Sequence, residues 1–245
     1  GIKLTPFTRE EVLAAIVGLV GRKNEASLIT YLNAYVYCLA KRNGELREII
    51  NDAEIVLADG ASIVCSNLLI NRKHIPRCIM TKIFDAFLTS LAVPPCKCIL
   101  IGATVPEAKT AQENINSLSC NVKITEVYSG YQTTEYYSKI LKENQNTDLV
   151  LIGMSSPKSE YICKLARELC RNSVIWHIGG GTIKCYAGTK KRAPEWTSKL
   201  GFEWLHRFIF EKHTRKRYLV YNFVFLYFVG VGFLRSLSRL FVTIK

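Results

Sequence analysis

The fold of this chain is constrained most by six short apolar segments that alternate with helical ones. These segments are rich in aliphatic residues and lie at residues 26–31, 54–58, 97–102, 122–127, 148–153 and 174–178. Strands that are apolar throughout, rather than at every second residue, are typical of a parallel sheet covered on both faces. The sequence therefore predicts an α/β fold with a mostly parallel central sheet.

Helical patterns fill the intervals between these strands. They cover residues 34–42, 45–52, 106–118, 134–144 and 159–170. A further helix is expected to begin near Thr8, whose hydroxyl can form a capping box with Glu11. The predicted architecture is Rossmann-like, with helices on both faces of the sheet, and ligands of such sheets bind at the carboxyl ends of the strands.

Positive charge is concentrated toward the end of the chain. The formal net charge is +13, and residues 184–245 hold 13 Lys and Arg against three acidic residues. Such a patch suits nucleic acid, anionic lipid or a ligand that bears a diphosphate, and charge alone does not choose among them.

A run of 17 uncharged residues, mostly aromatic and aliphatic, lies within this basic region between Arg217 and Arg235. Its length is the lower limit for a membrane span, so a transmembrane helix and a helix lying in the membrane interface are both compatible with it. A buried core helix is the third alternative. The sequence predicts an α/β catalytic domain at 1–195 and a helical, membrane-associating appendage at 196–245.

The cysteines and the N-terminus favour a cytosolic protein. Nine cysteines are scattered through apolar runs without the spacing of a zinc site or of a disulfide framework. The N-terminal residues show no signal-peptide pattern. Together with the appendage, these features predict a location at the cytoplasmic face of the plasma membrane.

Three segments at the ends of predicted strands could carry chemistry. Asp59 ends one strand and is followed by glycine, so its carboxylate could act as a general base at the binding edge, although a plain Asp-Gly turn is the simpler interpretation. The small-residue loop 153–160 could offer amide groups to a phosphate. The glycines at 179–181 leave room for a ligand against the backbone, but they do not form the GxGxxG pattern of nicotinamide dehydrogenases.

The order of these segments, together with two motifs near the end of the chain, resembles one family. The motifs are Arg-Ala-Pro-x-Trp at 192–196 and Gly-Phe-Glu-Trp-Leu-x-Arg at 201–207. Further matching pieces are Leu32-Asn33-Ala34, residues 53–60, Arg77, the Gly-x-x-Ser-Pro-Lys-x-Glu loop and the glycine run. On these pieces, the sequence is similar to the bacterial WecG/TagA/CpsF glycosyltransferases. The resemblance covers nearly the whole chain.

The resemblance implies an inverting hexosyltransferase that moves a hexose or N-acetylhexosamine from a UDP-sugar to a polyprenyl-diphosphate-linked acceptor, in the synthesis of a cell-surface polysaccharide or teichoic-acid-type polymer. Asp59 would take the proton from the acceptor hydroxyl, with Asn33 and Thr30 as the other catalytic candidates. No cofactor is implied, and no acidic pair suited to a metal ion is found, so transfer is expected to be metal-independent.

The resemblance also assigns binding roles. The donor would be held by Gly153, Ser156, Pro157, Glu160, Gly179, Gly180 and Gly181. Diphosphate groups of the donor or the acceptor would be neutralised by Arg77, Arg192, Arg207, Arg215 and Arg217. Attraction of the appendage arginines to an anionic membrane surface is the alternative, and the two roles can coexist.

Five positions near the expected pocket depart from the family's pattern: Tyr31, Met80, Lys82, Ser159 and Lys184. Tyr31 stands where a threonine is usual, with Thr30 one residue earlier, and Lys82 and Lys184 replace acids. Two such exchanges would alter which donor is accepted, so the sugar is not named. A catalytically inactive, membrane-bound relative remains an alternative, a nucleic-acid-binding protein is a weaker one, and self-association into a homo-oligomer is left open.

Overall fold

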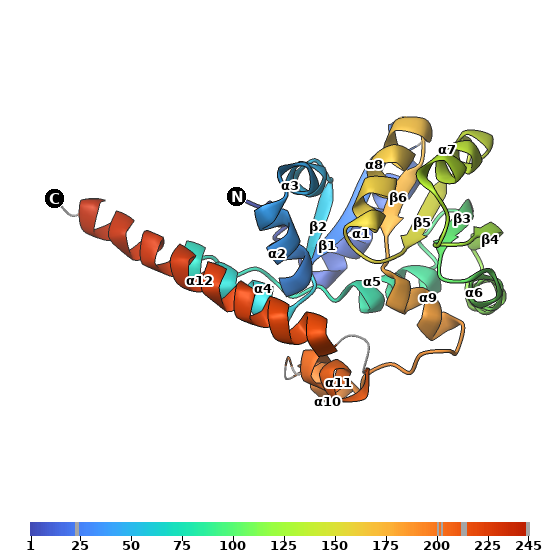
Figure 1. Cartoon of the computed structure of the whole chain (residues 1–245). Helices are drawn as coiled ribbons and strands as arrows, with labels where there is room; N and C mark the ends of the chain where they lie inside the picture. The colour runs from blue at the N-terminus through green and yellow to red at the C-terminus, as the bar shows by residue number, and fades with distance from the viewer. Residues whose placement is uncertain (23–24, 200, 202, 212–214, 244–245) are drawn as a thin grey trace.

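The computed structural model describes residues 1–245 apart from 23–24, 200, 202, 212–214 and 244–245. Its centre is a six-stranded, fully parallel sheet with the order β2-β1-β6-β5-β3-β4 (Figure 1). The strands are β1 Ser27–Leu32, β2 Ile55–Ala58, β3 Cys96–Gly102, β4 Val122–Tyr128, β5 Leu149–Gly153 and β6 Val174–His177. The predicted Rossmann-like α/β fold is confirmed.

The helices connect and cover these strands. They are α1 Arg9–Gly21, α2 Ala34–Arg42, α3 Gly44–Asn51, α4 Ala61–Asn71, α5 Met80–Thr89, α6 Val105–Leu118, α7 Thr134–Glu143, α8 Lys158–Leu169, α9 Gly180–Tyr186, α10 Glu195–Lys199, α11 Glu203–Phe210 and α12 Arg215–Thr243. The predicted capping box of Thr8 and Glu11 opens α1, and Thr104 and Glu107 form a second one at α6.

Both faces of the sheet are buried along β1, β2, β5, β6 and most of β3, as their continuous apolar sequences predict, whereas the edge strand β4 exposes Lys123, Thr125 and Glu126. Neighbouring residues of a strand point to opposite faces, and in β6 the side chain of Ile175 joins one hydrophobic cluster while Trp176 joins the other. The cluster around Trp176 includes Phe84 and Phe87 of α5, whose rings meet the indole edge-on. The sheet is therefore a two-sided core, and a polar ligand has access only at its edges.

Several helices have no clear local signal. The apolar residues of α4 are spread around the helix among serines and asparagines, so the segment lacks the one-sided pattern that identifies a surface helix. The first backbone N–H of α5, at Met80, is capped by Asp59 Oδ1 at 2.8 Å, a partner 21 residues away in sequence. The glycine run, predicted to be a loop, is one only at Gly179, because Gly180 already begins α9.

The long helix α12 lies along one side of the body and extends past it (Figure 1). Tyr221, Phe225 and Phe228 face α2, and Gly232 lies against Ile70 of α4. Its described apolar segment, Arg215–Ser236, is long and apolar enough to cross a membrane by length and composition alone, and only 6% of the most apolar window is buried. The alternative of a buried core helix is therefore wrong.

Close backbone contact at the ends of β3 and β5 makes Gly102 sensitive to substitution. A methyl group at Gly102 would overlap the carbonyl oxygen of Gly153, which the rigid sheet holds in place. We expect Gly102→Ala to cost about 3 kcal/mol and to lower the melting temperature on the order of 6–12 °C in thermal denaturation. In the control Gly18→Ala, no atom lies within 4 Å of the added methyl group in α1, so the melting temperature should hold or rise. Equal effects of the two substitutions would contradict the steric argument.

Candidate active site

A cavity of about 1850 Å³ opens at the carboxyl edge of the sheet. Its wall includes residues that follow β1, β2, β5 and β6, together with residues of α5, α9, α11 and α12. The loops expected to carry chemistry, after residues 31, 58, 101, 152 and 178, all contribute residues to this wall and therefore meet in one place.

Asp59 lies in this cavity directly after β2 and is half-buried. Its carboxylate oxygen Oδ1 accepts the hydrogen bond from Met80 N, and its carbonyl oxygen accepts one from Arg77 Nε at 3.0 Å. Its backbone N–H donates to Leu32 O at 3.1 Å, which ties it to the end of β1. A carboxylate oriented in this way at a cavity wall is suited to accept a proton from a bound ligand.

Asn33 lines the same cavity from the neighbouring strand end. Its side-chain oxygen accepts from Val36 N at 3.0 Å and so caps α2. Gly60, the residue after Asp59, is a neighbour of Asn33, since a Cβ atom there would lie 3.6 Å from the Asn33 Cα. Asp59 and Asn33 thus come from adjacent strand ends at the same wall of the cavity.

Thr30 does not reach the cavity. Its side chain is 2% exposed, and its hydroxyl lies 3.3 Å from Nδ1 of the buried His177. The adjacent Tyr31 lines the cavity instead, and its ring stacks on His177 with centroids 4.7 Å apart. Burial lowers the pKa of His177 below its ordinary value, so the imidazole is expected to be neutral near pH 7.

All three glycines of the run line the cavity, but they do not leave equal room. Gly179 has φ +74°, and a Cβ atom there would lie 2.7 Å from the hydroxyl of Tyr31. At Gly180 the Cβ atom would lie 3.2 Å from Gly153 O, and at Gly181 its nearest neighbour would be Lys190 Nζ at 3.6 Å. Tyr31 therefore occupies the space beside Gly179, and backbone access for a ligand is greatest at Gly181.

The serine-proline loop forms another part of the wall. Gly153 and Ser156 line the cavity, whereas Pro157 and Glu160 are not among the described residues that do so. The hydroxyl of Ser156 donates to Glu160 Oε1 at 2.6 Å, and Glu160 is 1% exposed, with Oε1 3.7 Å from His177 Nδ1. Glu160 therefore orients the Ser156 hydroxyl from the protein interior, and its own side chain is too buried to contact a ligand in the cavity.

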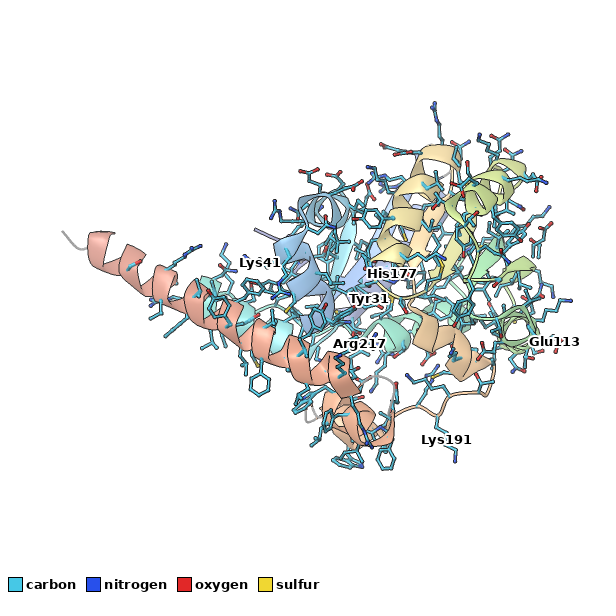
Figure 2. All side chains as sticks on the ribbon, in the orientation of Figure 1. Tyr31, Lys41, Glu113, His177, Lys191 and Arg217 are labelled. Carbon is cyan, nitrogen blue, oxygen red and sulfur yellow. The ribbon has the colours of Figure 1, made fainter. Side chains whose placement is uncertain are left out.

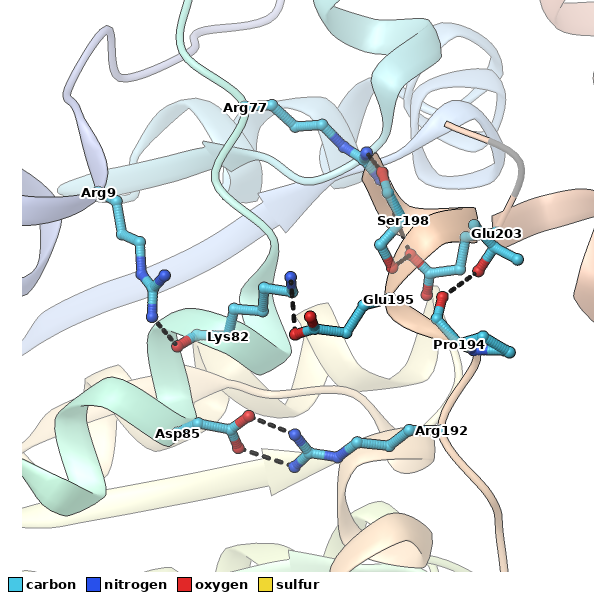
Figure 3. A network of polar contacts seen from close by, with 10 residues as sticks. Arg9, Arg77, Lys82, Asp85, Arg192, Pro194, Glu195, Ser198 and Glu203 are labelled. Carbon is cyan, nitrogen blue, oxygen red and sulfur yellow. Dashed lines mark hydrogen bonds and ion pairs between the residues drawn. The ribbon is translucent and has the colours of Figure 1, made fainter. Parts of the chain in front are cut away.

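Two of the predicted phosphate-binding arginines are engaged in protein contacts (Figure 3). Arg77 donates to the carbonyl oxygens of Asp59 and Ser198, and its Nη2 lies 3.7 Å from Glu203. Arg192 makes a two-pronged ion pair with Asp85, with Nη2 2.7 Å from Oδ1. Through these contacts, both side chains connect the segment that follows α9 to other parts of the cavity wall.

The appendage arginines differ in position. Arg217 lines the cavity near the start of α12 (Figure 2), and its guanidinium lies 4.9 Å from the centre of the Tyr35 ring. Arg215 instead donates to the carbonyl oxygens of Phe208 and Ile209 at the end of α11. The side chain of Arg207 lies outside the described residues.

The two lysines that depart from the family's pattern both lie in the cavity wall. Lys82 Nζ is 3.8 Å from Glu195, and Lys184 Nζ is 3.9 Å from Glu107. The sequence does not identify Glu195 and Glu107 as partners of these lysines, because the pairs form only when distant segments meet. Among the described residues, no group of three or more His, Cys, Asp or Glu side chains is arranged to hold a metal ion.

The cavity wall is basic overall. Its described residues include nine Lys and Arg against six Asp and Glu, which favours an anionic ligand. In a comparison with protein families, the sequence model of the glycosyl transferase WecG/TagA/CpsF family matches residues 1–239, nearly the whole chain.

Proposed function

Because this chain belongs to the WecG/TagA/CpsF glycosyltransferase family, we propose that its cavity binds a UDP-sugar and a polyprenyl-diphosphate-linked acceptor. The family acts in cell-surface polysaccharide synthesis. Within that activity, we propose an inverting transfer of a hexose or N-acetylhexosamine.

The observation that carries the proposal is the position of Asp59. It lies in one basic cavity with Ser156 and the glycine run, and its carboxylate is oriented by the amide of Met80. In the proposed step, Asp59 takes the proton of the acceptor hydroxyl while the hydroxyl oxygen attacks the anomeric carbon and UDP leaves from the opposite face. One base is sufficient for inversion.

Among the predicted arginines, Arg217 is the best placed to neutralise a diphosphate. Its described contacts are with the rings of Tyr35 and Tyr218, and within the described part of the chain no carboxylate pairs with it. Arg77 and Arg192 already have carboxylate partners, so we propose that they shape the site and contribute charge without direct contact. Thr30, which is buried, is proposed only as a support for His177.

The C-terminal helix supports a membrane role for residues 196–245, the part proposed as the appendage. One stripe of α12 is packed on α2 and α4, and the opposite stripe exposes large apolar side chains. These exposed residues are Leu219, Val220, Phe223, Leu226, Tyr227 and Leu234. A helix with one stripe on its own domain is suited to lie in the membrane interface, so we propose this arrangement at the cytoplasmic face rather than a span.

Binding of UDP tests the proposal directly. We expect UDP at about 100 times its Kd to stabilise the folded chain by about 2.7 kcal/mol, which raises the melting temperature on the order of 5–10 °C. The shift should persist in EDTA, because no metal is assigned to the site, and inorganic phosphate should give a much smaller one. Absence of a shift with UDP and with a panel of UDP-hexoses would contradict the transferase proposal and favour a non-catalytic, membrane-bound relative.

A further inference from the structure

Tyr35 joins the C-terminal helix to the serine-proline loop. It lies in the first turn of α2, is half-buried and lines the cavity. Its hydroxyl donates to the carbonyl oxygen of Ser156 at 3.3 Å. On α12, Arg217 lies over its ring, and Tyr221 meets the ring edge-on with centroids 4.7 Å apart.

The loop is therefore held from two directions at one residue. The hydroxyl of Ser156 is fixed by the buried Glu160 of α8, and the carbonyl of Ser156 is fixed by Tyr35 of α2. The first contact is local, because Glu160 follows Ser156 by only four residues. The second depends on a ring whose own orientation is set by two residues of α12, one helical turn apart.

We propose that Tyr35 is a positioning residue that makes the conformation of the serine-proline loop at 154–157 depend on the docking of α12. The inference rests on the proposed function, since this loop is the proposed donor-binding segment. When α12 is seated on α2, Arg217 and Tyr221 hold the ring, and the phenol hydroxyl holds Ser156 in the cavity wall. When α12 moves away, the ring gains rotamer freedom and the loop loses one of its two fixed points.

Two variants break this connection at different points. Tyr35→Phe keeps the ring for Arg217 and Tyr221 but removes the hydroxyl that donates to Ser156. Gly232→Phe acts from the other end, because even a Cβ atom there would lie 2.8 Å from Cδ1 of Ile70 in α4, and we expect the much larger phenyl ring to push α12 outward. Gly230→Phe is the matched control, since no atom lies within 4 Å of its added Cβ.

The experiment measures hydrogen exchange of the 154–160 amides in the full chain without ligand, and then the Kd of UDP. We expect exchange to be about five-fold faster in Tyr35→Phe and in Gly232→Phe, the loss of about one hydrogen bond. The double variant should be no faster than either single one, because both break the same connection, and Gly230→Phe should match the parent chain.

Unchanged exchange in Tyr35→Phe, or additive effects in the double variant, would overturn the inference. Weaker UDP binding in both single variants, with the control unaffected, would support it further. If the parent chain binds no UDP, the proposed function fails, and the exchange experiment still decides whether the loop depends on α12.

Discussion

Replacing Asp59 by Asn is expected to lower the rate of sugar transfer by about 10²–10⁴-fold, the usual contribution of a general base. The amide oxygen of the new side chain can still accept the hydrogen bond from Met80 N, which the Asp59 carboxylate accepts at 2.8 Å. The start of α5 should therefore stay in place, and the melting temperature and the affinity for UDP should change little. The measurement is transfer to a lipid-linked acceptor, with UDP binding followed in parallel.

Asp148→Asn is the matched control for this experiment. Asp148 accepts a hydrogen bond from Lys97 N at 2.8 Å next to the start of β5, and it does not line the cavity. It is thus an oriented carboxylate at the opposite edge of the same sheet. Full transfer activity in Asp59→Asn, or an equal loss in both variants, would remove Asp59 from the role of base.

The second large effect is expected at the membrane. The double variant Phe223→Glu/Tyr227→Glu changes two neighbouring side chains on the outer stripe of α12, each 67% exposed. If these rings enter the bilayer interface, their loss costs about 4 kcal/mol of membrane binding, roughly a thousand-fold in affinity. Sedimentation with anionic vesicles should then leave the protein in the supernatant, while the melting temperature stays near that of the parent chain.

The control for membrane release must add the same charge elsewhere. Leu91→Glu/Leu118→Glu does so at two leucines that are 86% and 57% exposed and precede β3 and β4, at the edge of the sheet opposite the cavity. This variant carries the same net charge, so simple repulsion from the vesicles would affect both proteins. Equal sedimentation of the two double variants would contradict insertion of the α12 stripe.

The strands and the capped helices of this fold were predictable because their signals are local. Residues such as Thr8 with Glu11, or the apolar run of β5, carry the necessary information within a few positions. The helix α5 was not predicted, since the carboxylate that caps it comes from Asp59. Helix α9 was missed because its first residues are glycines, which are poor helix formers.

The site was predictable at the level of loops and less so at the level of side chains. The loops at Asp59, Ser156 and the glycine run do line one cavity. The sequence alone does not decide whether Thr30 or Tyr31 faces that cavity. The two are adjacent in one strand, and successive side chains of a strand point to opposite faces. The ion pair of Arg192 with Asp85 was equally inaccessible, because its members are 107 residues apart in sequence.

The contacts of Arg77 connect the residue after β2 to the segment that follows α9. Its guanidinium donates to the carbonyl oxygen of Ser198 in α10 and lies 3.7 Å from Glu203 of α11. Arg77 therefore joins the end of β2 to both short helices, so a displacement of α10 or α11 is expected to reach the backbone of Asp59. The Asp59 carboxylate has a separate support in the amide of Met80, and its orientation is expected to persist through such a displacement.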